Sequence, residues 1–558
     1  MRRIARSFVF ALVAVVTAAM CWSGHLPVAN FVHADDSWRA EGSQGVVVAG
    51  GPGPEAAEAG IAVLKDGGNA VDATAATLLV LSVIDPGNFC FGGEVPWLVY
   101  DGERKTVEVL AGQGVAPRLA TREHFAAKGG IPPTGIEPAA VPAALDAILT
   151  ALDRYGTITF THAAQPMLVA LGNRPDPWCG DLAKTIRELI DVEKTATDRR
   201  QGLRRVADHF YRGPIAWRID KWSRASGGLL RYADLATHTT RIEQPVTGEY
   251  RGLTVVKCGI WTQGPMLLQT LQLLEGFELA PLGPTDPQCV HLAVESLKLA
   301  LADRDAYYGD PLFSDVPLRE LLAPSYAETR RSLIDRGRAS RELRPGDPLT
   351  ASPLKSPAAK PAAGAGGPQR DTTTCLVADR FGNVVAATPS GWGGTTAGDT
   401  GVQLGSRLRS LTMEAGHANE VLPGKRPRIT LTPTIVLKDN RPVLAVSVAG
   451  GDLQDQVSLQ MLLATIDFAR SPAQAVTLPR YSTAHHIGSF SQPPAKLGSL
   501  TINPEAGPAV LERLKALGHE VSESAGPIGH PCVLRIDPVT GRKEAAGDPR
   551  AKRHARAH

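Results

Sequence analysis

The sequence has few aromatic residues, no paired cysteine motifs and, after its N-terminal segment, no long apolar run. Aromatic residues make up 5% of the chain, and 7 cysteines are scattered over 558 residues with no CxxC pair and no zinc spacing. This pattern excludes a disulfide scaffold, although one or two isolated bridges stay open. Beyond the N-terminal segment, no run approaches the roughly 20 apolar residues that span a bilayer. With 43% hydrophobic and 21% charged residues, the chain is globular and long enough for more than one core.

A large excess of positive or negative charge is also lacking. The formal net charge of +3 equals the charge of Arg2, Arg3 and Arg6 in a 34-residue segment without acids, so the remainder is balanced. A basic cluster at the C-terminus, Lys552 to Arg556, is typical of a solvated chain end. The charge pattern therefore gives no indication of a nucleic-acid partner.

The N-terminus has the three parts of a secretory signal peptide. Basic MRRIAR precedes an apolar run from Phe8 to Met20, and Val32 and Ala34 are spaced as at a cleavage site. We therefore expect residues 1–34 to be removed and the mature protein to be periplasmic or secreted, without a membrane span.

The next region alternates helical and strand patterns. The spacing predicts a helix to about Lys65 and a second one capped by Asn69, ending at Pro86-Gly87. FCFGGEVPWLVYDGERKTVEVL then predicts a glycine turn and a two-stranded hairpin. Residues 138–170 and 290–308 are again helical, and about 175–235 predict a charged helical lobe.

Residues 351–370, ASPLKSPAAKPAAGAGGPQR, are dominated by Ala, Pro, Gly and Ser. Such a stretch buries too little apolar surface to offset its ordering entropy, so we expect 350–371 to be a mobile linker. DTTTCLVADRFGNVVAATPS follows as strand, turn and strand, which places a threonine cluster at the start of a buried strand.

A threonine at that place has a specific chemical use. Its hydroxyl is a weak nucleophile unless a base lies within hydrogen-bond reach. A chain cut between Asp371 and Thr372 would supply one, because it creates an α-amino group on the same residue. Threonines at strand starts are nevertheless common, so this pattern alone does not establish catalysis.

The chain resembles the γ-glutamyltranspeptidase family of N-terminal nucleophile hydrolases. The resemblance is carried, in order along the chain, by EAGIAVLKDGGNAVDATAA, FGGEVPWLVYDG, FYRGPIA, LLQTLQLLEGF, VHLAVESLKLALADRDAYYGDP, TTTCLVAD with Gly382-Asn383, GKRPRITLTPTIV and VAGGDLQDQ. It covers nearly the whole mature chain.

The resemblance implies an α+β fold, a four-layer αββα sandwich. It implies autocatalytic cleavage at Asp371-Thr372 into a large subunit, 35–371, and a small catalytic subunit, 372–558. Thr372 matches the nucleophile, Gly450 and Gly451 the oxyanion-hole pair, and Ser390 a second hydroxyl near the nucleophile. No metal or organic cofactor is implied.

The chain departs from the family at the γ-glutamyl pocket. Gln113 stands where the family has an arginine suited to bind the substrate carboxylate. Trp392 and Ser410 replace the asparagine and aspartate that bind the α-amino group, and Ile429 and Thr430 replace paired serines. The resemblance thus implies a retained catalytic centre and a rebuilt substrate-binding pocket.

Three further groups carry weaker predictions. Asp303-Arg304-Asp305 at a helix end predicts a salt-bridged surface or interface. His485 and His486 are adjacent in an extended segment and point to opposite faces, which argues against a shared metal site. Asp452 is predicted either to tune the new α-amino group or to cap the following helix.

The predicted function is amide hydrolysis or acyl transfer through a Thr372 acyl-enzyme, nominally γ-glutamyl transfer or glutathione hydrolysis with water, an amine or a peptide as acceptor. Two alternatives stay open. One is an acylase or amidase for a different acyl group. The other is an exported homologue that never matures and acts as a binding protein.

Overall fold

The computed structural model describes residues 37–350, 352–354, 372–391 and 394–558. The predicted signal peptide, most of the predicted linker, Asp371 and Trp392 lie outside these ranges.

Two seven-stranded antiparallel sheets form the centre of the fold. Sheet A has the order β1 (Arg39–Gly42), β18 (Lys543–Gly547), β17 (His530–Ile536), β13 (Arg441–Ala449), β12 (Thr434–Lys438), β7 (Leu253–Lys257), β6 (Val246–Tyr250). Sheet B has the order β19 (Arg553–Ala557), β2 (Val46–Gly50), β8 (Cys375–Ala378), β9 (Val384–Ala387), β3 (Val95–Asp101), β4 (Thr106–Gly112), β5 (Arg241–Glu243).

The two sheets pack face to face. A core cluster between them joins residues of both sheets, among them Val48, Leu376, Ile435 and Leu534. Alternate residues of the same strands face outward and join helices, which is why most of these strands are buried on both faces.

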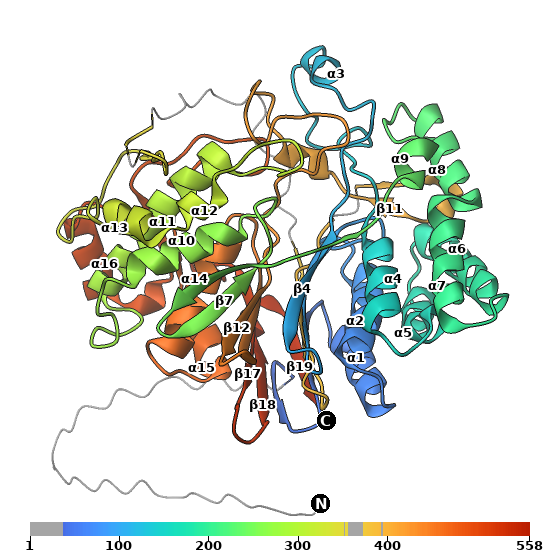
Figure 1. The fold of residues 1–558 in the computed structure, drawn as a ribbon, viewed down its shortest axis with the longest axis horizontal. Helices are drawn as coiled ribbons and strands as arrows, with labels where there is room; N and C mark the ends of the chain where they lie inside the picture. Colours follow the sequence, from blue (N-terminus) through green and yellow to red (C-terminus); the bar gives the residue numbers. More distant parts are fainter. Residues whose placement is uncertain (1–36, 351, 355–371, 392–393) are drawn as a thin grey trace, which may run out of the picture. The chain divides into compact units, whose positions relative to one another are not determined.

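Helices cover the outer face of each sheet (Figure 1). Over sheet B lie α1 (Glu55–Lys65), α2 (Ala70–Ile84) and α4 (Ala144–Tyr155). Farther from the sheet, α5 (Phe160–Gly172), α6 (Pro177–Lys194), α7 (Arg199–Tyr211) and α8 (Pro214–Ala225) pack against these helices and one another. Over sheet A lie α10 (Gly264–Leu274), α11 (Pro287–Tyr307), α12 (Leu318–Leu321), α13 (Pro324–Arg331), α14 (Leu453–Ile466), α15 (Pro472–Thr477) and α16 (Pro508–Ala516). The predicted four-layer αββα sandwich is confirmed.

The remaining elements are short. They are α3 (Arg122–Ala126), α9 (Tyr232–Ala236), the pair β10 (Thr395–Thr396) and β11 (Gln403–Leu404), and a three-stranded sheet of β14 (Tyr481–Ser482), β15 (Ser499–Ile502) and β16 (Glu520–Glu523).

The predicted elements agree with the structure, with three corrections. The basic C-terminal cluster, predicted as a solvated chain end, forms β19 and pairs with β2, and Arg553 is buried. The predicted helical lobe is present, but its long helical stretch is broken at Thr195, and Asp198 caps a new helix by accepting from Gln201 N at 2.9 Å. Strand β8 begins at Cys375, so the threonines precede the strand instead of opening it.

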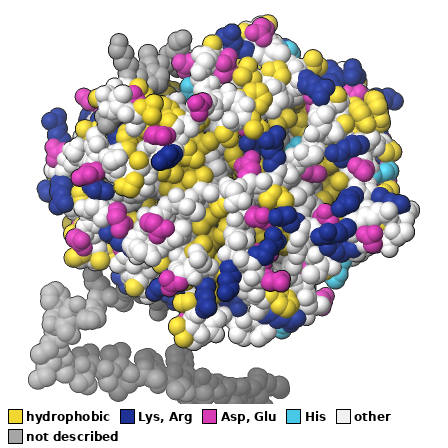
Figure 2. Space-filling model, viewed as in Figure 1, with side chains coloured by type: hydrophobic (Ala, Val, Ile, Leu, Met, Phe, Trp, Pro, Cys, Tyr) yellow, Lys and Arg dark blue, Asp and Glu magenta, His cyan; other side chains and the backbone are white. Residues whose placement is uncertain are grey.

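Three surface and core features bear on the sequence predictions. No helix in the described part of the chain has the length and apolarity that crossing a membrane requires. The six cysteines that the structure describes are buried and free. Acidic and basic side chains are interspersed on the face shown in Figure 2, in keeping with the balanced charge.

Candidate functional site

The predicted nucleophile lies at one edge of sheet B, where four strand ends meet. Thr372 precedes β8, Ser390 follows β9, Glu94 precedes β3 and Gln113 follows β4. Because β8, β9, β3 and β4 are antiparallel neighbours, these positions lie side by side. Glu94 and Ser390 exchange two backbone hydrogen bonds of 2.9 Å.

The Thr372 hydroxyl lies between two polar side chains. Thr372 is 2% exposed, and its Oγ1 is 3.3 Å from Ser390 Oγ. The amide of Gln454, on the first turn of α14, takes the orientation that satisfies both its ends. Its nitrogen donates to the carbonyl oxygens of Val448 at 3.1 Å and Thr430 at 2.9 Å, and its oxygen accepts from Thr372 Oγ1 at 3.3 Å. The structure thus places Ser390 Oγ beside Thr372 Oγ1, and the role of Ser390 stays a prediction.

Ser390 also contacts a buried ion pair, which Arg407 forms with Glu94. Arg407 Nε donates to Glu94 Oε1 at 2.7 Å, and its NH2 group donates to Ser390 Oγ at 3.0 Å. A third nitrogen of the same guanidinium lies 3.5 Å from Ser410 Oγ. Arg407 thus joins both serines of the predicted site.

The glycine pair follows β13 at the matching edge of sheet A. Gly450 has φ +142° and Gly451 has φ +56°, a region that L side chains rarely adopt. A Cβ on Gly450 would also approach Gly529 Cα at 3.2 Å. Gly451 O accepts from Gln454 N at 3.1 Å, so the glycine pair and Thr372 share Gln454 as a neighbour.

The residue after the glycines anchors a charged network. Asp452 occupies the cap position of α14, but its side chain makes no capping bond. Its carboxylate pairs with Arg304 at 2.5 Å and accepts from Ser489 N at 2.8 Å. Burial alone would raise the pKa of Asp452, but the neighbouring Arg304, His486 and Arg428 lower it well below its usual value.

The salt bridges predicted for Asp303-Arg304-Asp305 are present, but the predicted surface position is wrong. Arg304 is fully buried and pairs with both Asp305 and Asp452, because α11 runs behind the glycine pair. Asp303 is buried as well and pairs with Arg330 at 3.2 Å. The triplet's own segment does not reveal its burial, because Asp452 lies 148 residues from Arg304 and Arg330 lies 27 residues from Asp303.

The residues predicted to bind substrate occupy different environments. Thr430 contacts Gln454, and Ser410 contacts Arg407, so both belong to the site. Ile429 does not reach it, because its side chain packs in the core between the sheets. Gln113 is 2% exposed and donates to the neighbouring Gly114 carbonyl oxygen at 3.1 Å. It lines a cavity of about 280 Å³, whose lining residues do not include Thr372.

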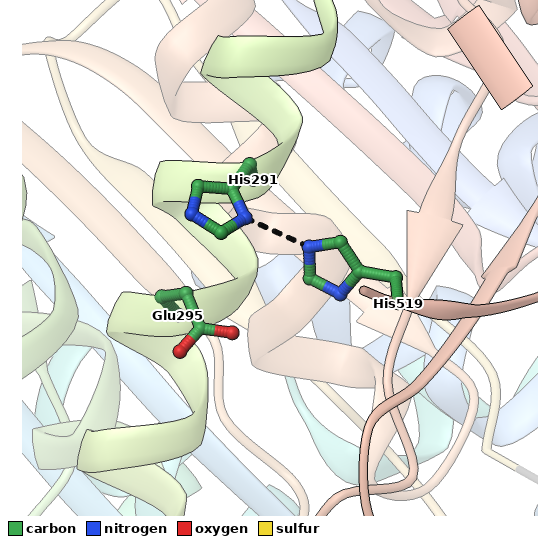
Figure 3. Close-up of side chains that lie close together, drawn as sticks. All are labelled: His291, Glu295 and His519. Carbon is green, nitrogen blue, oxygen red and sulfur yellow. Dashed lines mark hydrogen bonds between the residues drawn. The ribbon is translucent and has the colours of Figure 1, made fainter. Parts of the chain in front are cut away.

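One group in the described part of the chain has the chemistry of a metal site. His291 and Glu295 on α11 face His519, as Figure 3 shows. His291 Nε2 is 2.8 Å from the Asp335 carbonyl oxygen, so Nδ1 is left to accept from His519 Nε2 at 2.9 Å. Glu295 pairs with Lys298 at 2.6 Å. Each facing atom has a partner and an ammonium faces the carboxylate, which favours a hydrogen-bonded cluster over an ion site.

His485 and His486 contact different partners. His485 Nε2 lies 3.0 Å from the Glu342 carbonyl oxygen, and its Nδ1 accepts from Gly498 N at 2.9 Å. His486 Nδ1 instead lies 3.2 Å from Arg304.

The sequence predictions omitted Glu94, Arg407 and Gln454. A sequence signal existed for two of them. Glu94 is a single acid between glycines and an apolar strand, and Gln454 lies on the first turn after the glycine pair. Arg407 had none, since its partner Glu94 lies 313 residues away in the chain.

Comparison with known proteins identifies the family. The family model described as Gamma-glutamyltranspeptidase matches residues 56–172 and 180–558. The chain belongs to the γ-glutamyltranspeptidase family. It is therefore an enzyme of a family with amidohydrolase and transpeptidase chemistry, and the resemblance stated from its motifs is confirmed.

Relatives in this family include glutathione hydrolases and acylases. The chain is 29% identical to the glutathione hydrolase proenzyme of Bacillus subtilis (strain 168), over 89% of this chain and 88% of that protein. It is 29% identical to the Acylase ACY 1 proenzyme of Pseudomonas sp. (strain SE83), over 89% and 91%.

Two solved structures share the whole fold. LmbA2991HD is 34% identical with a TM-score of 0.83, covering 93% of this chain and 99% of that one. The cephalosporin acylase from Bacillus halodurans is 25% identical with a TM-score of 0.79, covering 96% and 99%.

Proposed function

We propose that the protein hydrolyses or transfers an acyl group through a Thr372 ester. The main support is the position of Thr372 Oγ1, which lies 3.3 Å from both Ser390 Oγ and the Gln454 amide. The glycine pair follows β13 directly and precedes the helix that carries Gln454. The hydroxyl adds to the substrate carbonyl carbon and its proton passes to the Thr372 α-amine. The carbon–nitrogen bond then breaks and the amine leaves with that proton.

The second half-reaction repeats these steps with water or an amine. The acceptor adds to the ester carbonyl, gives a proton to the α-amine, and displaces the Thr372 oxygen, which regains that proton. Backbone N–H groups of Gly450 and Gly451 would stabilise the oxyanion in both halves, each donor contributing about 3 kcal/mol.

The α-amine requires prior cleavage of the chain, so we propose autocatalytic maturation. Thr372 Oγ adds to the carbonyl carbon of Asp371, the peptide nitrogen takes the proton as the bond breaks, and water hydrolyses the resulting ester. The products are a large subunit, 35–371, and a small subunit, 372–558. The glutathione hydrolase and acylase relatives are both proenzymes, which supports this proposal.

Intact mass spectrometry of the purified protein tests maturation. We expect fragments that begin near Asp35 and at Thr372, and one uncut chain for Thr372→Ala. Thr373→Ala is the matched control, because this neighbouring hydroxyl packs against Gly50 and not against Ser390. A small fragment beginning at Thr373, or normal cleavage of Thr372→Ala, would refute the assignment. A chain that never cleaves would support the binding-protein alternative.

The acyl group is proposed to differ from γ-glutamyl. Gln113 bonds its own loop and Ile429 packs in the core, so neither offers a charged partner to a glutamyl head. Glutathione hydrolysis is the activity named for several relatives, whereas the acylase relative favours another acyl group. Comparing kcat/KM for γ-glutamyl-p-nitroanilide with that for acyl anilides lacking the α-amine decides between them. A γ-glutamyl compound as the best substrate would refute this proposal.

We also propose export, on the basis of the N-terminal signal pattern alone. Cell fractionation is expected to place the fragment that begins near Asp35 outside the cytoplasm. A protein that keeps residues 1–34 would contradict it.

A further inference from the structure

A buried ion pair joins the end of β7 to the first turn of α14. Lys257 and Asp455 are both fully buried, and Lys257 Nζ donates to Asp455 Oδ1 at 2.9 Å. Nζ also donates to the Thr432 carbonyl oxygen at 2.9 Å and to Thr434 Oγ1 at 2.8 Å. Three acceptors match the three donors of an ammonium. Lys257 is therefore a cation, and Asp455 is its counter-ion.

Asp455 depends on Lys257 for its charge. Its second carboxylate oxygen, Oδ2, is buried with no hydrogen-bond partner. A Cβ on Gly264 would lie 3.0 Å from both Lys257 Cε and Thr432 Oγ1, so protein closely surrounds the pair. Burial raises the pKa of Asp455 and lowers that of Lys257, and each partner opposes the shift of the other. A carboxylate in such a place is costly without its cation.

Three further titratable groups face Asp455 from neighbouring elements. They are Cys258, which follows β7, and Arg304 and Tyr308 at the end of α11. Burial raises the pKa of Cys258 and of Tyr308 far above neutrality, so both are uncharged at pH 7. Arg304 already forms two other ion pairs. Among the described residues, Lys257 is therefore the cation that pairs with Asp455.

Asp455 also lies close to the proposed catalytic machinery. Gln454, the preceding residue, donates from its backbone N to the Gly451 carbonyl oxygen at 3.1 Å, and its side chain contacts Thr372 Oγ1. Four residues separate Gly451 from Asp455, which is about one helical turn, or about 6 Å along the axis. An oxyanion at the glycine pair would form within that distance of α14's first acidic residue.

A carboxylate at that place would oppose the oxyanion unless its charge is balanced. The N-terminus of a helix carries partial positive charge, which favours an anion. An ionised acid in the first turn counteracts this effect. Two like charges about 7–10 Å apart, at an effective dielectric constant of about 20, repel enough to slow a reaction by about 10- to 100-fold.

We propose that Lys257 assists the proposed oxyanion hole by neutralising Asp455. This inference rests on the proposed function. The pair ties β7, the segment before β12 and α14 together through Nζ and Oδ1, and so fixes the helix that follows the glycine pair. Because the charges balance, this anchoring does not oppose the oxyanion. Lys257 touches no reacting atom and acts through the charge of Asp455.

The test compares the wild type, Lys257→Met, Asp455→Asn and the double variant on an acyl p-nitroanilide, with cleavage first completed and checked by intact mass spectrometry. Lys257→Met leaves a carboxylate near the oxyanion, so kcat should fall by about 10- to 100-fold. Asp455→Asn leaves no negative charge, so kcat should not fall. The double variant is neutral and should have a kcat close to that of the wild type.

The opposite outcomes of the two single variants separate charge from structure. Both variants break the same ion pair, so a merely structural role predicts that both lower kcat alike, and that result would overturn the inference. If Lys257→Met does not fold or mature, the other two variants still decide. A kcat of Asp455→Asn or of the double variant well below that of the wild type would then overturn it.

The pH profile is a second measurement. Without Lys257, burial keeps the pKa of Asp455 raised, so this carboxyl is neutral at low pH and becomes charged as pH rises. The ratio of the Lys257→Met kcat to the wild-type kcat should therefore fall with rising pH, whereas the ratio for the double variant should stay constant. A constant ratio for Lys257→Met would contradict the inference.

Lys298→Met is the matched control. Lys298 forms a buried ion pair of the same kind with Glu295 on α11, at 2.6 Å, and neither residue contacts the proposed site. This variant should unfold at lower urea concentration but keep kcat and its pH profile. A fall in kcat as large as that of Lys257→Met would show that loss of any buried pair suffices, and would overturn the inference.

Thr372→Ala separates this inference from the proposed function. Turnover that Thr372→Ala abolishes, together with equal effects of Lys257→Met and Asp455→Asn, would overturn the role of Lys257 and leave the proposed function standing. Turnover that survives Thr372→Ala would refute the proposed function, and the role of Lys257 with it.

Discussion

At the residue scale, Arg407 positions Ser390 beside Thr372, the proposed nucleophile. Its guanidinium holds the Ser390 and Ser410 hydroxyls while Glu94 balances its charge. Both members of the pair are less than 5% exposed, so each is costly without the other. Arg407 acts through Ser390, which makes it a positioning residue.

Glu94→Gln should therefore destabilise the protein by about 3–5 kcal/mol, because it leaves the Arg407 guanidinium buried and unpaired. The double variant Glu94→Gln with Arg407→Met should recover most of that stability in urea unfolding. The kcat of the double variant should be lower than that of the wild type, with little change in KM, because Met at position 407 cannot donate a hydrogen bond to Ser390 Oγ. Equal stability of wild type and Glu94→Gln would contradict the coupling.

Site residues could be predicted from the sequence where they lie in continuous motifs, but not where the site depends on contacts between distant segments. Thr372, Ser390 and Gly450 lie in motifs that are continuous in sequence. The meeting of Glu94 with Arg407, and of Arg304 with Asp452, depends on how distant segments pack. Nothing in local spacing reports such contacts, which is why Arg304 was expected at the surface and Arg407 was omitted.

At the element scale, helix ends with strong capping chemistry were predictable. The Asn69 side chain caps α2 by accepting from Val71 N at 2.9 Å and Asp72 N at 3.0 Å. In turn, Asn69 N donates to the Asp72 carboxylate at 3.0 Å. The break between α6 and α7 was missed, because the charged pattern runs through it without Pro or Gly.

Asn69→Ala should lower the free energy of unfolding by about 1–2 kcal/mol, as expected for loss of a cap. Asn69→Asp is the matched control. It keeps the capping oxygen and loses the bond from Nδ2 to the Tyr155 carbonyl oxygen, so it should cost less. Urea unfolding of the three proteins measures both effects, and a larger cost for Asn69→Asp would show that the Tyr155 contact matters more than the cap.

At the scale of the whole molecule, buried histidines predict acid sensitivity. Burial and nearby cations, Lys298 for the first two and Arg553 for the third, lower the pKa of His485 to about 4 and those of His519 and His530 to about 3. These groups are neutral when folded but bind protons when unfolded below about pH 6.5. Their stabilisation is full above pH 6.5 and is lost as pH falls toward 4.

Each such histidine should lower the free energy of unfolding by about 1.4 kcal/mol per pH unit in that window. His485→Gln should flatten the slope between pH 6.5 and 5 by that amount in urea unfolding, whatever its effect at pH 7. The exposed His162→Gln is the control. Comparing slopes between variants cancels the contribution of the carboxylates, and an unchanged slope in His485→Gln would contradict the prediction.

The sheets also predict what becomes of the two fragments if the proposed cleavage occurs. In sheet B, β2 from before residue 371 pairs with β8 and β19 from after it, and β3 pairs with β9. In sheet A, β7 and β1 pair with β12 and β18 across the same division. Separating the fragments would break five strand pairs and expose the core between the sheets. The fragments should therefore co-elute in size-exclusion chromatography and part only in denaturant, whereas separate elution in native buffer would mean that the sheets rearrange on cleavage.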